Sequence, residues 1–325
     1  MTSGAVLLNT VARQSRISDV DIVRLRDCLT HEGPICEQQA RVLLQIELSN
    51  ATRHISWKAY FLDAMLEFAI HTAEPHGYLT ADNTDWLLRH AAPEGRILSP
   101  LLFEMLTTLL CAARWAPQRL VSALLDEVYC AVASGDGPLR PGLDVPAGVI
   151  TGRDVEVVRR ILYASGAGDL RAINRAEAAG LLAIDAACAR APLLPAWADL
   201  FCKALYDAAL AASACTGPAR EVFLAPQAGL SVASLIEAIH VTGQRYRSQS
   251  AEDLAITALE RQRYEIVTGD TVEPCTAGWF CTAFNADRPG TAAFALLFEA
   301  LIRQRINLHA DLQSLLAIRT NVRAA

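Results

Sequence analysis

Two histidines and a carboxylate lie close together in the segment His71-Thr-Ala-Glu74-Pro-His76, and imidazole and carboxylate groups are common zinc ligands. A helix that binds zinc usually carries its ligands at positions i and i+4, so that both side chains face the same side. These histidines are five residues apart, and the proline between them interrupts a helix. We therefore interpret the segment as a solvated helix end.

Acidic residues in turns are the second group whose chemistry suits a metal, in this case calcium. A calcium loop needs oxygen ligands at alternating positions, a glycine at the bend and a glutamate at its end. The acidic residues here lack that spacing, and they are placed where carboxylates complement the positive end of a helix dipole. A divalent-metal site stays an alternative, with the candidates Asp82, Asp85 and Glu94 in one half and Asp270, Glu273 and Asp287 in the other.

Cys275 and Cys281 flank Trp279 and are candidates for a redox pair. We expect Cys281 to lie on a helix and face the core, with Cys275 just before that helix. A thiol in apolar surroundings stays protonated and is a poor nucleophile. We therefore interpret these two cysteines as an inert pair.

A cluster of arginines suggests anion binding. Such a cluster can bind phosphate or an acidic partner, although it more often forms a solvated surface. Its members are Arg245, Arg247, Arg261 and Arg263. The sequence contains no G-x-S-x-G, no phosphate-binding glycine loop and no H-E-x-x-H. No catalytic residue and no cofactor is predicted.

Composition limits the classes of protein to which the chain can belong. Of its 325 residues, 52% are hydrophobic and 20% are charged, as in a globular protein long enough for two domains. The net charge of −6 argues against a nucleic-acid-binding role, and no run of eighteen apolar residues predicts a membrane span. Nine cysteines without a Cys-x-x-Cys pair, and the lack of a secretory signal, indicate the reducing cytoplasm.

An internal repeat is the strongest sign of how the chain is organised. The sequences Ile17-Ser-Asp-Val-Asp21 and Ile150-Thr-Gly-Arg-Asp154 each place a hydroxyl side chain three residues before an aspartate, which is typical of a helix N-terminus. Later, the pattern Trp57-x-x-x-Phe61 returns as Trp197-x-x-x-Phe201. Because the chain has only five tryptophans, we interpret this recurrence as a duplication.

The repeat continues on both sides of the tryptophan pattern. In the preceding helix, apolar residues recur three and four apart in both copies, and Glu47 corresponds to Asp185. The later pairs are Trp86 with Trp279, Phe103 with Phe298, Leu120 with Leu312 and Leu124 with Leu316. The tryptophans can form the base of a ligand pocket or bind a partner, but we favour a role in packing the hydrophobic core of each copy. The aromatic residues given this structural role are Trp57, Phe61, Trp86, Trp197, Phe201 and Trp279.

These patterns predict an all-α fold made of two tandem, diverged helical-bundle repeats. No segment shows sustained alternation of apolar and polar residues, so little or no sheet is expected. The predicted parts are an N-terminal extension (1–16), repeat 1 (17–133), a linker rich in proline and glycine (134–149), and repeat 2 (150–325). Repeat 2 contains an insertion near 212–253, in which we expect one additional helix around Val232 to His240.

Two segments resemble a family of duplicated helical proteins found in alphaproteobacteria. They are Ile173-Asn-Arg-Ala-Glu177 leading to the second tryptophan pattern, and Glu74-Pro-x-Gly77-Tyr78 leading to Asp85-Trp86-Leu87. The resemblance covers roughly residues 17 to 320. The helical unit also resembles, more loosely, the TerB-like fold of tellurite-resistance and co-chaperone proteins. Neither resemblance supplies a catalytic residue.

The leading hypothesis for function is a non-enzymatic helical module that binds another protein, in a stress- or envelope-linked process. Two related copies can present two similar surfaces or a groove between them. The alternatives are a divalent-metal-binding protein of TerB-like type and an enzyme whose site lies in a cleft between the repeats. The oligomeric state and the identity of the partner do not follow from the sequence.

Overall fold

The computed structural model describes residues 4–49, 51–165, 172–227, 229, 231–284, 291–303 and 307–324. In these ranges the chain consists of helices, together with two pairs of two-residue strands. The predicted all-α class is confirmed. None of the helices in these ranges combines the length and the apolar character needed to span a membrane.

The helices of the first half follow one another through short connections. They are α1 (Gly4–Val11), α2 (Asp19–Glu32), α3 (Glu37–Leu48), α4 (Ser56–Leu66), the π-helix η1 (Glu67–Thr72), α5 (Ala81–Ala91), α6 (Pro100–Ala112) and α7 (Gln118–Ser134). Two short strands, β1 (Arg16–Ile17) and β2 (Thr52–Arg53), pair in parallel and join the starts of α2 and α4.

The second half contains longer connections and one antiparallel strand pair, β3 (Cys215–Thr216) with β4 (Arg247–Ser248). Its helices are α8 (Gly152–Ser165), α9 (Arg175–Ala187), α10 (Pro195–Ala211), α11 (Arg220–Phe223), α12 (Val232–Gly243), α13 (Ala251–Thr268), α14 (Ala277–Ala283), α15 (Ala292–Arg303) and α16 (Ala310–Ala324). Helix α12 covers the additional helix expected around Val232 to His240.

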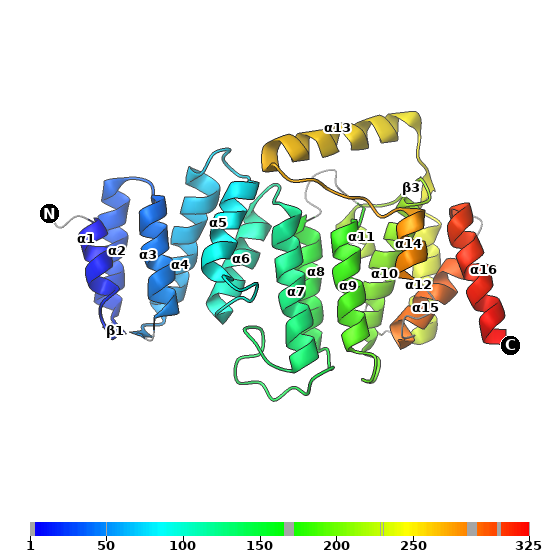
Figure 1. Cartoon of the computed structure of the whole chain (residues 1–325), viewed down its shortest axis with the longest axis horizontal. Coiled ribbons are helices and arrows are strands. Elements are labelled where there is room, and N and C mark those ends of the chain that lie inside the picture. Colours follow the sequence, from blue (N-terminus) through cyan, green and yellow to red (C-terminus); the bar gives the residue numbers. More distant parts are fainter. Residues whose placement is uncertain are drawn as a thin grey trace.

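The helices stand side by side in an elongated row, with the two ends of the chain at opposite ends of the row (Figure 1). Most of them follow sequence order along the row and run roughly parallel or antiparallel to one another. Helix α13 is different: it lies across one edge of the row, from the side of β3 back toward α6 and α7. It is therefore the only helix in the described ranges that crosses several others in this way.

The two halves pack directly against each other. Helix α7 packs on α8 and α9, and α6 packs on α8. The contact between α7 and α9 is so close that a Cβ added at Gly180 would lie 2.9 Å from Leu125 Cδ1. The buried apolar residues of both halves belong to one hydrophobic cluster. The core is therefore continuous across the segment expected to be a linker.

The segment 134–149 is a folded loop between α7 and α8, at the opposite edge of the row from α13 (Figure 1). Arg140 fixes it from inside, because its buried Nη2 donates to Val149 O and to Asp154 Oδ2, each at 2.7 Å. Gly135 ends α7 with φ of 79°, and a Cβ there would lie 2.6 Å from Val145 O. The sequence therefore needs glycine at this turn because it gives both the left-handed backbone and the close approach.

The N-terminal extension is part of the row. Helix α1 packs on α2 and α3, and its side chains Leu8 and Val11 are buried. The next helix begins as the sequence predicts: Ser18 caps α2 and forms a reciprocal capping box with Asp21. Thr151 and Asp154 make the same two hydrogen bonds at the start of α8.

Candidate functional site

In each half of the row, a buried carboxylate accepts a hydrogen bond from the indole of a tryptophan. Trp57 Nε1 donates to Glu47 Oε2 at 3.0 Å, and Trp197 Nε1 donates to Asp185 Oδ1 at 3.1 Å. All four residues are buried. The carboxylates belong to α3 and α9, and the tryptophans to the first turns of α4 and α10.

The other oxygen of each carboxylate accepts a hydrogen bond from a hydroxyl. Ser99 Oγ donates to Glu47 Oε1 at 3.0 Å, and Thr291 Oγ1 donates to Asp185 Oδ2 at 2.5 Å. The same two hydroxyl oxygens accept the backbone N–H three residues later and so cap α6 and α15. In each half, a buried carboxylate, an indole and a hydroxyl thus join three helices. Because these three groups bond to one another, we interpret the arrangement as structural.

The other tryptophan pair does not occupy equivalent positions in its helices. Thr80 caps α5 and Thr276 caps α14. Trp86 is the sixth residue after its cap, whereas Trp279 is the third. Both rings are half-buried. The two tryptophans therefore lie three residues apart when each is counted from the cap of its own helix.

Phe103 and Phe298 show a similar displacement. Phe103 lies four residues after the cap Ser99, and Phe298 lies seven residues after the cap Thr291. Both phenylalanines are buried in the core, although their positions counted from the caps differ by about one helical turn.

The acidic metal candidates of the two halves meet at an arginine. Arg119 Nη1 lies 2.6 Å from Asp85 Oδ1, and Arg119 Nε lies 3.8 Å from Asp270 Oδ2. These two carboxylates raise the pKa of Arg119, Asp85 through a hydrogen bond first. An arginine therefore lies where two of the candidate ligands come together.

The remaining acidic candidates do not gather. Asp82 and Glu94 are exposed, Glu273 is exposed and accepts a bond from Arg175 Nη1 at 2.7 Å, and Asp287 lies outside the described residues. His76 Nε2 lies 3.2 Å from Glu74 Oε1, and His71 is on η1. In the described ranges, no group of three or more His, Cys, Asp or Glu side chains is arranged to hold a metal ion.

The cysteine pair is arranged differently from the expectation. Cys275 is buried, just before α14, whereas Cys281 on α14 is only half-buried. Burial raises the pKa of both thiols, most strongly for Cys275. The position facing the core is therefore the one ahead of the helix, because the capping residue Thr276 turns the chain there. Both are free thiols.

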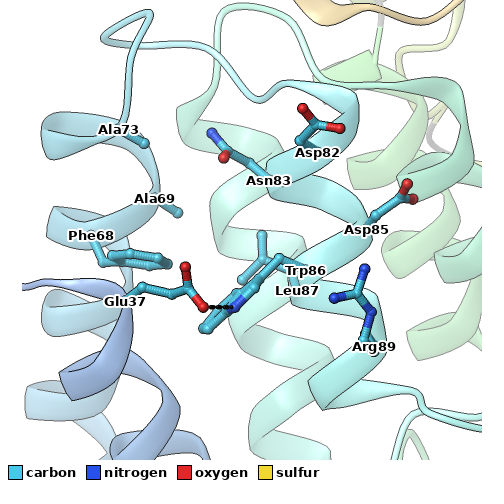
Figure 2. Close-up of a pocket in the computed structure, with 10 residues that line it drawn as sticks. All are labelled: Glu37, Phe68, Ala69, Ala73, Asp82, Asn83, Asp85, Trp86, Leu87 and Arg89. Carbon is cyan, nitrogen blue, oxygen red and sulfur yellow. Dashed lines mark hydrogen bonds between the residues drawn. The ribbon is translucent and has the colours of Figure 1, made fainter.

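A shallow pocket of 300 Å³ lies between η1 and α5 (Figure 2). Trp86 forms its floor: Nε1 donates to Glu37 Oε1 at 2.9 Å, and the ring centroid lies 5.1 Å from that of Phe68. The bond from Trp86, followed by one from Arg41, lowers the pKa of Glu37. Asp82 lies at the opposite rim of the pocket and does not approach Glu37 (Figure 2). The ionisable groups of this pocket do not converge.

The arginine cluster of the sequence is dispersed in the structure. Arg247 pairs with Asp253, with N–O distances of 2.5 and 2.8 Å, and Arg263 pairs with Glu260 at 2.7 Å. Arg261 is half-buried on the side of α13 that faces the row. The four arginines of this cluster therefore do not form one basic patch. Of the four, only Arg261 lines the cavity beneath α13.

Helix α13 has its polar and apolar sides reversed with respect to a normal surface helix. Its outward side carries Ala255, Leu259, Gln262 and Ile266, spaced by four, three and four residues, and all four are exposed. Leu259 is 48% exposed and Ile266 is 74% exposed. The polar residues Asp253, Thr257, Glu260 and Arg261 lie toward the row and are less exposed. A surface helix normally turns its apolar side toward the protein and its polar side toward water.

One aromatic side chain anchors α13 near its end. Tyr264 is buried, its hydroxyl donates to Ala116 O at 2.8 Å, and its ring meets Trp115 edge-on with centroids 6.1 Å apart. A side-chain hydrogen bond also links Tyr264 to Gln118, although burial dominates and raises the pKa of Tyr264. The connection between α6 and α7 therefore holds the far end of α13.

A cavity of 490 Å³ lies between α13 and the row. Residues of α10, α11, the β3 segment and the turn before α9 form its floor, and α13 forms its roof. Its apolar lining includes Leu254, Ile256, Val272, Pro274 and Pro218. A volume of this size is within the range of small-molecule sites.

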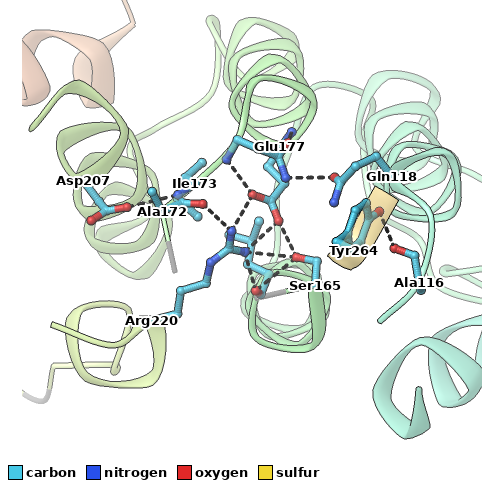
Figure 3. Close-up of polar contacts among 11 residues, drawn as sticks. Ala116, Gln118, Ser165, Ala172, Ile173, Glu177, Asp207, Arg220 and Tyr264 are labelled. Carbon is cyan, nitrogen blue, oxygen red and sulfur yellow. Dashed lines mark hydrogen bonds and ion pairs between the residues drawn. The ribbon is translucent and has the colours of Figure 1, made fainter. Parts of the chain in front are cut away.

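A buried ion pair stabilises the floor of this cavity (Figure 3). Arg220 binds Glu177 through both of its terminal nitrogens, at 2.7 and 2.9 Å, and also donates to Ala172 O and Leu162 O. Ser165 Oγ donates to the same carboxylate. Because each buried charge is paired and hydrogen-bonded, the pair is a structural element of the floor.

The ion pair continues into a chain of hydrogen bonds that reaches α13. Glu177 forms a capping box with Asn174, whose Nδ2 donates to Gln118 Oε1 at 2.8 Å (Figure 3). Gln118 in turn contacts Tyr264. The N-cap of α9, Asn174, and the first residue of α7, Gln118, therefore connect the cavity floor with the anchor of its roof.

Asp207 is a buried carboxylate on the other side of the floor. Tyr246 OH donates to its Oδ1 at 2.6 Å, and Ile173 N donates to its Oδ2 at 3.1 Å. Burial raises the pKa of Asp207 to about 6, although these two hydrogen bonds oppose the shift. The close position of Tyr246 depends on Gly217, where an added Cβ would lie 2.3 Å from the ring.

Arg220, Asp207 and Tyr264 were not among the residues singled out from the sequence, and Glu177 was noted only as part of a motif. Asn174 and Glu177 have the spacing of a capping box, and this signal was available. For Arg220 no local pattern exists, because its partner lies 43 residues away. The cavity is formed by the long segment after α10, and its position follows only from the tertiary fold.

Comparison of the chain with protein-family models, with curated protein sequences and with solved structures finds no significant match in any of the three. The fold and the geometry of its surfaces are therefore the basis for the functional proposal.

Proposed function

We propose that this chain is a non-enzymatic helical scaffold that binds another protein, and that the outward side of α13 is the contact surface. The observation that carries this proposal is the stripe of Ala255, Leu259, Gln262 and Ile266, which α13 presents to solvent. We call these four residues the α13 stripe. Four-three-four spacing is the spacing by which one helix packs along another. The partner that suits it is an amphipathic helix of another protein.

Energetics favour a partner for this surface. Removing a leucine or isoleucine side chain completely from water is worth about 1.5–3 kcal/mol. Ile266 is 74% exposed and Leu259 is 48% exposed, so both keep much of their apolar surface in contact with water. The side that faces the row carries Tyr264 and Thr268 instead, which fix the rotation of the helix. The way in which α13 packs on the row therefore leaves Leu259 and Ile266 exposed to solvent.

We propose further that the row arose from two copies of one helical unit. The support is the recurrence of buried groups at matched positions: Glu47 with Trp57 and Ser99 in one half, and Asp185 with Trp197 and Thr291 in the other. The capping boxes at the starts of α2 and α8 also match. Helices α11, α12 and α13 lie between α10 and α14, where the first half has only η1 and a short connection. On this view, the binding helix belongs to the segment that distinguishes the second copy.

The divalent-metal alternative has weaker support, because Arg119 lies between Asp85 and Asp270. For the compartment we propose the cytoplasm, since all nine cysteines are free thiols.

A photo-crosslinking amino acid placed at Leu259 tests the interaction proposal in the cells that make the protein. Leu259 lies in the centre of the α13 stripe, and the matched control position is Val20 on α2, which is 58% exposed. We expect a discrete crosslinked species from position 259 and none from position 20. Adding Ile266→Glu to the chain that carries the crosslinker should remove that species. The same crosslinked species from both positions, or none from position 259, would contradict the proposal.

A further inference from the structure

The cavity beneath α13 has charged groups on its wall, and all but one of them have hydrogen-bond or ion-pair partners within the chain. Arg220 is paired with Glu177, and Asp253 is paired with Arg247. Both oxygens of Asp207 are engaged by the donors Tyr246 and Ile173 N. These groups are satisfied without any ligand.

Arg261 is the exception. It lines the roof of the cavity, and within the described residues it has neither a hydrogen bond nor an ion pair. A guanidinium stays charged at every physiological pH and presents donors in a fork that matches a carboxylate or a phosphate. Its neighbour on the same helix, Arg263, is already paired with Glu260. The guanidinium of Arg261 is therefore free to bind an anionic ligand in the cavity.

One part of the lining is apolar and suits an aliphatic body. Leu254 and Ile256 are contributed by α13, and Val272 and Pro274 by the segment that follows it. The other part is polar and can orient a head group, with Thr257 on α13 and Thr216 and Gln249 on the opposite side. A cavity of 490 Å³ with an apolar part, a polar part and one free guanidinium suits a small amphipathic molecule.

We propose that this cavity binds a small amphipathic organic anion, with its carboxylate or phosphate group on Arg261 and its aliphatic body against Val272 and Leu254. The site is separate from the α13 stripe, because the two lie on opposite sides of the same helix. The inference therefore goes beyond the protein-binding role and does not depend on it.

Isothermal titration calorimetry with the purified full chain tests the proposal at pH 7. The probes are octanoate and octyl phosphate, each used below its micelle concentration, so that the two arms distinguish a carboxylate from a phosphate. Octylammonium supplies the same body with the opposite charge, and acetate and inorganic phosphate supply the head groups alone. We expect saturable binding with one site per chain for at least one of the two octyl anions, and binding at least about tenfold weaker for each control probe.

Variants then locate the site. Arg261→Met should weaken the binding of the octyl anion by about tenfold or more and leave the melting temperature unchanged, since Arg261 has no partner to lose. The matched control on the same helix is Arg263→Met, which should keep wild-type affinity. Leu259→Ser should also keep it, because it changes the α13 stripe and leaves the cavity intact. The proposal is overturned if neither octyl anion binds, if octylammonium binds as well as they do, or if Arg261→Met binds like the wild type.

Discussion

Trp197 and Asp185 form a buried hydrogen bond of 3.1 Å, from the indole nitrogen to the carboxylate. The carboxylate also accepts the hydroxyl of Thr291, so that one side chain satisfies two buried donors from two other helices. Removing it leaves both donors without a partner in a place that water does not reach. The cost of such a change is set by desolvation as well as by the lost bonds.

Asp185→Ala should therefore reduce the free energy of unfolding by about 2–4 kcal/mol, measured by urea denaturation. Glu47→Ala should give a loss of similar size, because Glu47 accepts from Trp57 and Ser99 in the same way. The control is Glu299→Ala, which removes an exposed ion pair and should change stability by less than about 1 kcal/mol. Equal effects of Asp185→Ala and Glu299→Ala would show that the buried carboxylate is not a structural tie.

The ion pair of Arg220 and Glu177 gives a prediction about unpaired charge. Glu177→Leu leaves the buried guanidinium without its anion and should cost about 3–5 kcal/mol in the same measurement. The double variant Glu177→Leu with Arg220→Met removes both charges and should recover a large part of this loss. If the double variant is as unstable as the sum of the single variants, charge pairing is not what makes the single change costly.

Asp207 makes stability depend on pH. Its pKa is about 6 in the folded chain, compared with 3.8 as the ordinary value, so the folded chain binds the proton more tightly. Between about pH 4 and pH 6 the folded state therefore holds more protons than the unfolded state, and stability should fall as pH rises through this window. A shift of about two pKa units corresponds to about 3 kcal/mol in total.

Urea denaturation at several pH values between 4 and 7 measures this fall. Asparagine cannot ionise, so Asp207→Asn should remove about 3 kcal/mol of the fall in stability between pH 4 and pH 6. This change in slope is expected whatever the effect of the substitution on stability at any single pH. The comparison is Asp126→Asn on a different helix: burial raises the pKa of Asp126 by less, so this variant should flatten the pH dependence by a smaller amount than Asp207→Asn. An unchanged slope in Asp207→Asn would mean that Asp207 titrates normally in the folded chain.

Tyr264 should control the local stability of α13 more than the stability of the whole chain. Its hydroxyl and ring hold the end of the helix on Ala116 and Trp115, and few other side chains of α13 are buried. Tyr264→Ala should speed amide hydrogen exchange in residues 251–268 by about tenfold or more, while α7 and α9 keep their protection. Tyr264→Phe should have an intermediate effect, because it keeps the ring and loses one hydrogen bond. Exchange that accelerates equally in α9 would contradict a local role.

Local sequence signals predicted the helices well, because they depend on neighbours in the chain. The hydroxyl–aspartate spacing at Ser18 and Thr151 predicted the starts of α2 and α8. The sequence also predicted that Glu47 corresponds to Asp185, and in the structure each of these carboxylates accepts a hydrogen bond from a tryptophan. The sequence also pairs Trp86 with Trp279, and these two residues lie at different distances from the caps of their helices.

The cavity and the binding helix could not be predicted in the same way. Arg220, Glu177 and Tyr264 are brought together by contacts between segments 43 to 148 residues apart. The stripe of α13 has the spacing of a core face, so periodicity alone places Leu259 and Ile266 inside the protein. Only the position of Tyr264 against Ala116 shows that this face is turned outward.

Because one hydrophobic cluster passes without interruption from α7 into α8 and α9, neither half can stand as an independent folding unit. Cutting the peptide bond within residues 141–145, in the exposed part of the loop before α8, would leave the two pieces held together by their shared interior. Expressed separately, each piece would expose the apolar surface that the other normally covers, and would precipitate or require its complement. Co-expression of the two fragments should therefore restore a native-like heterodimer that behaves as one cooperative protein.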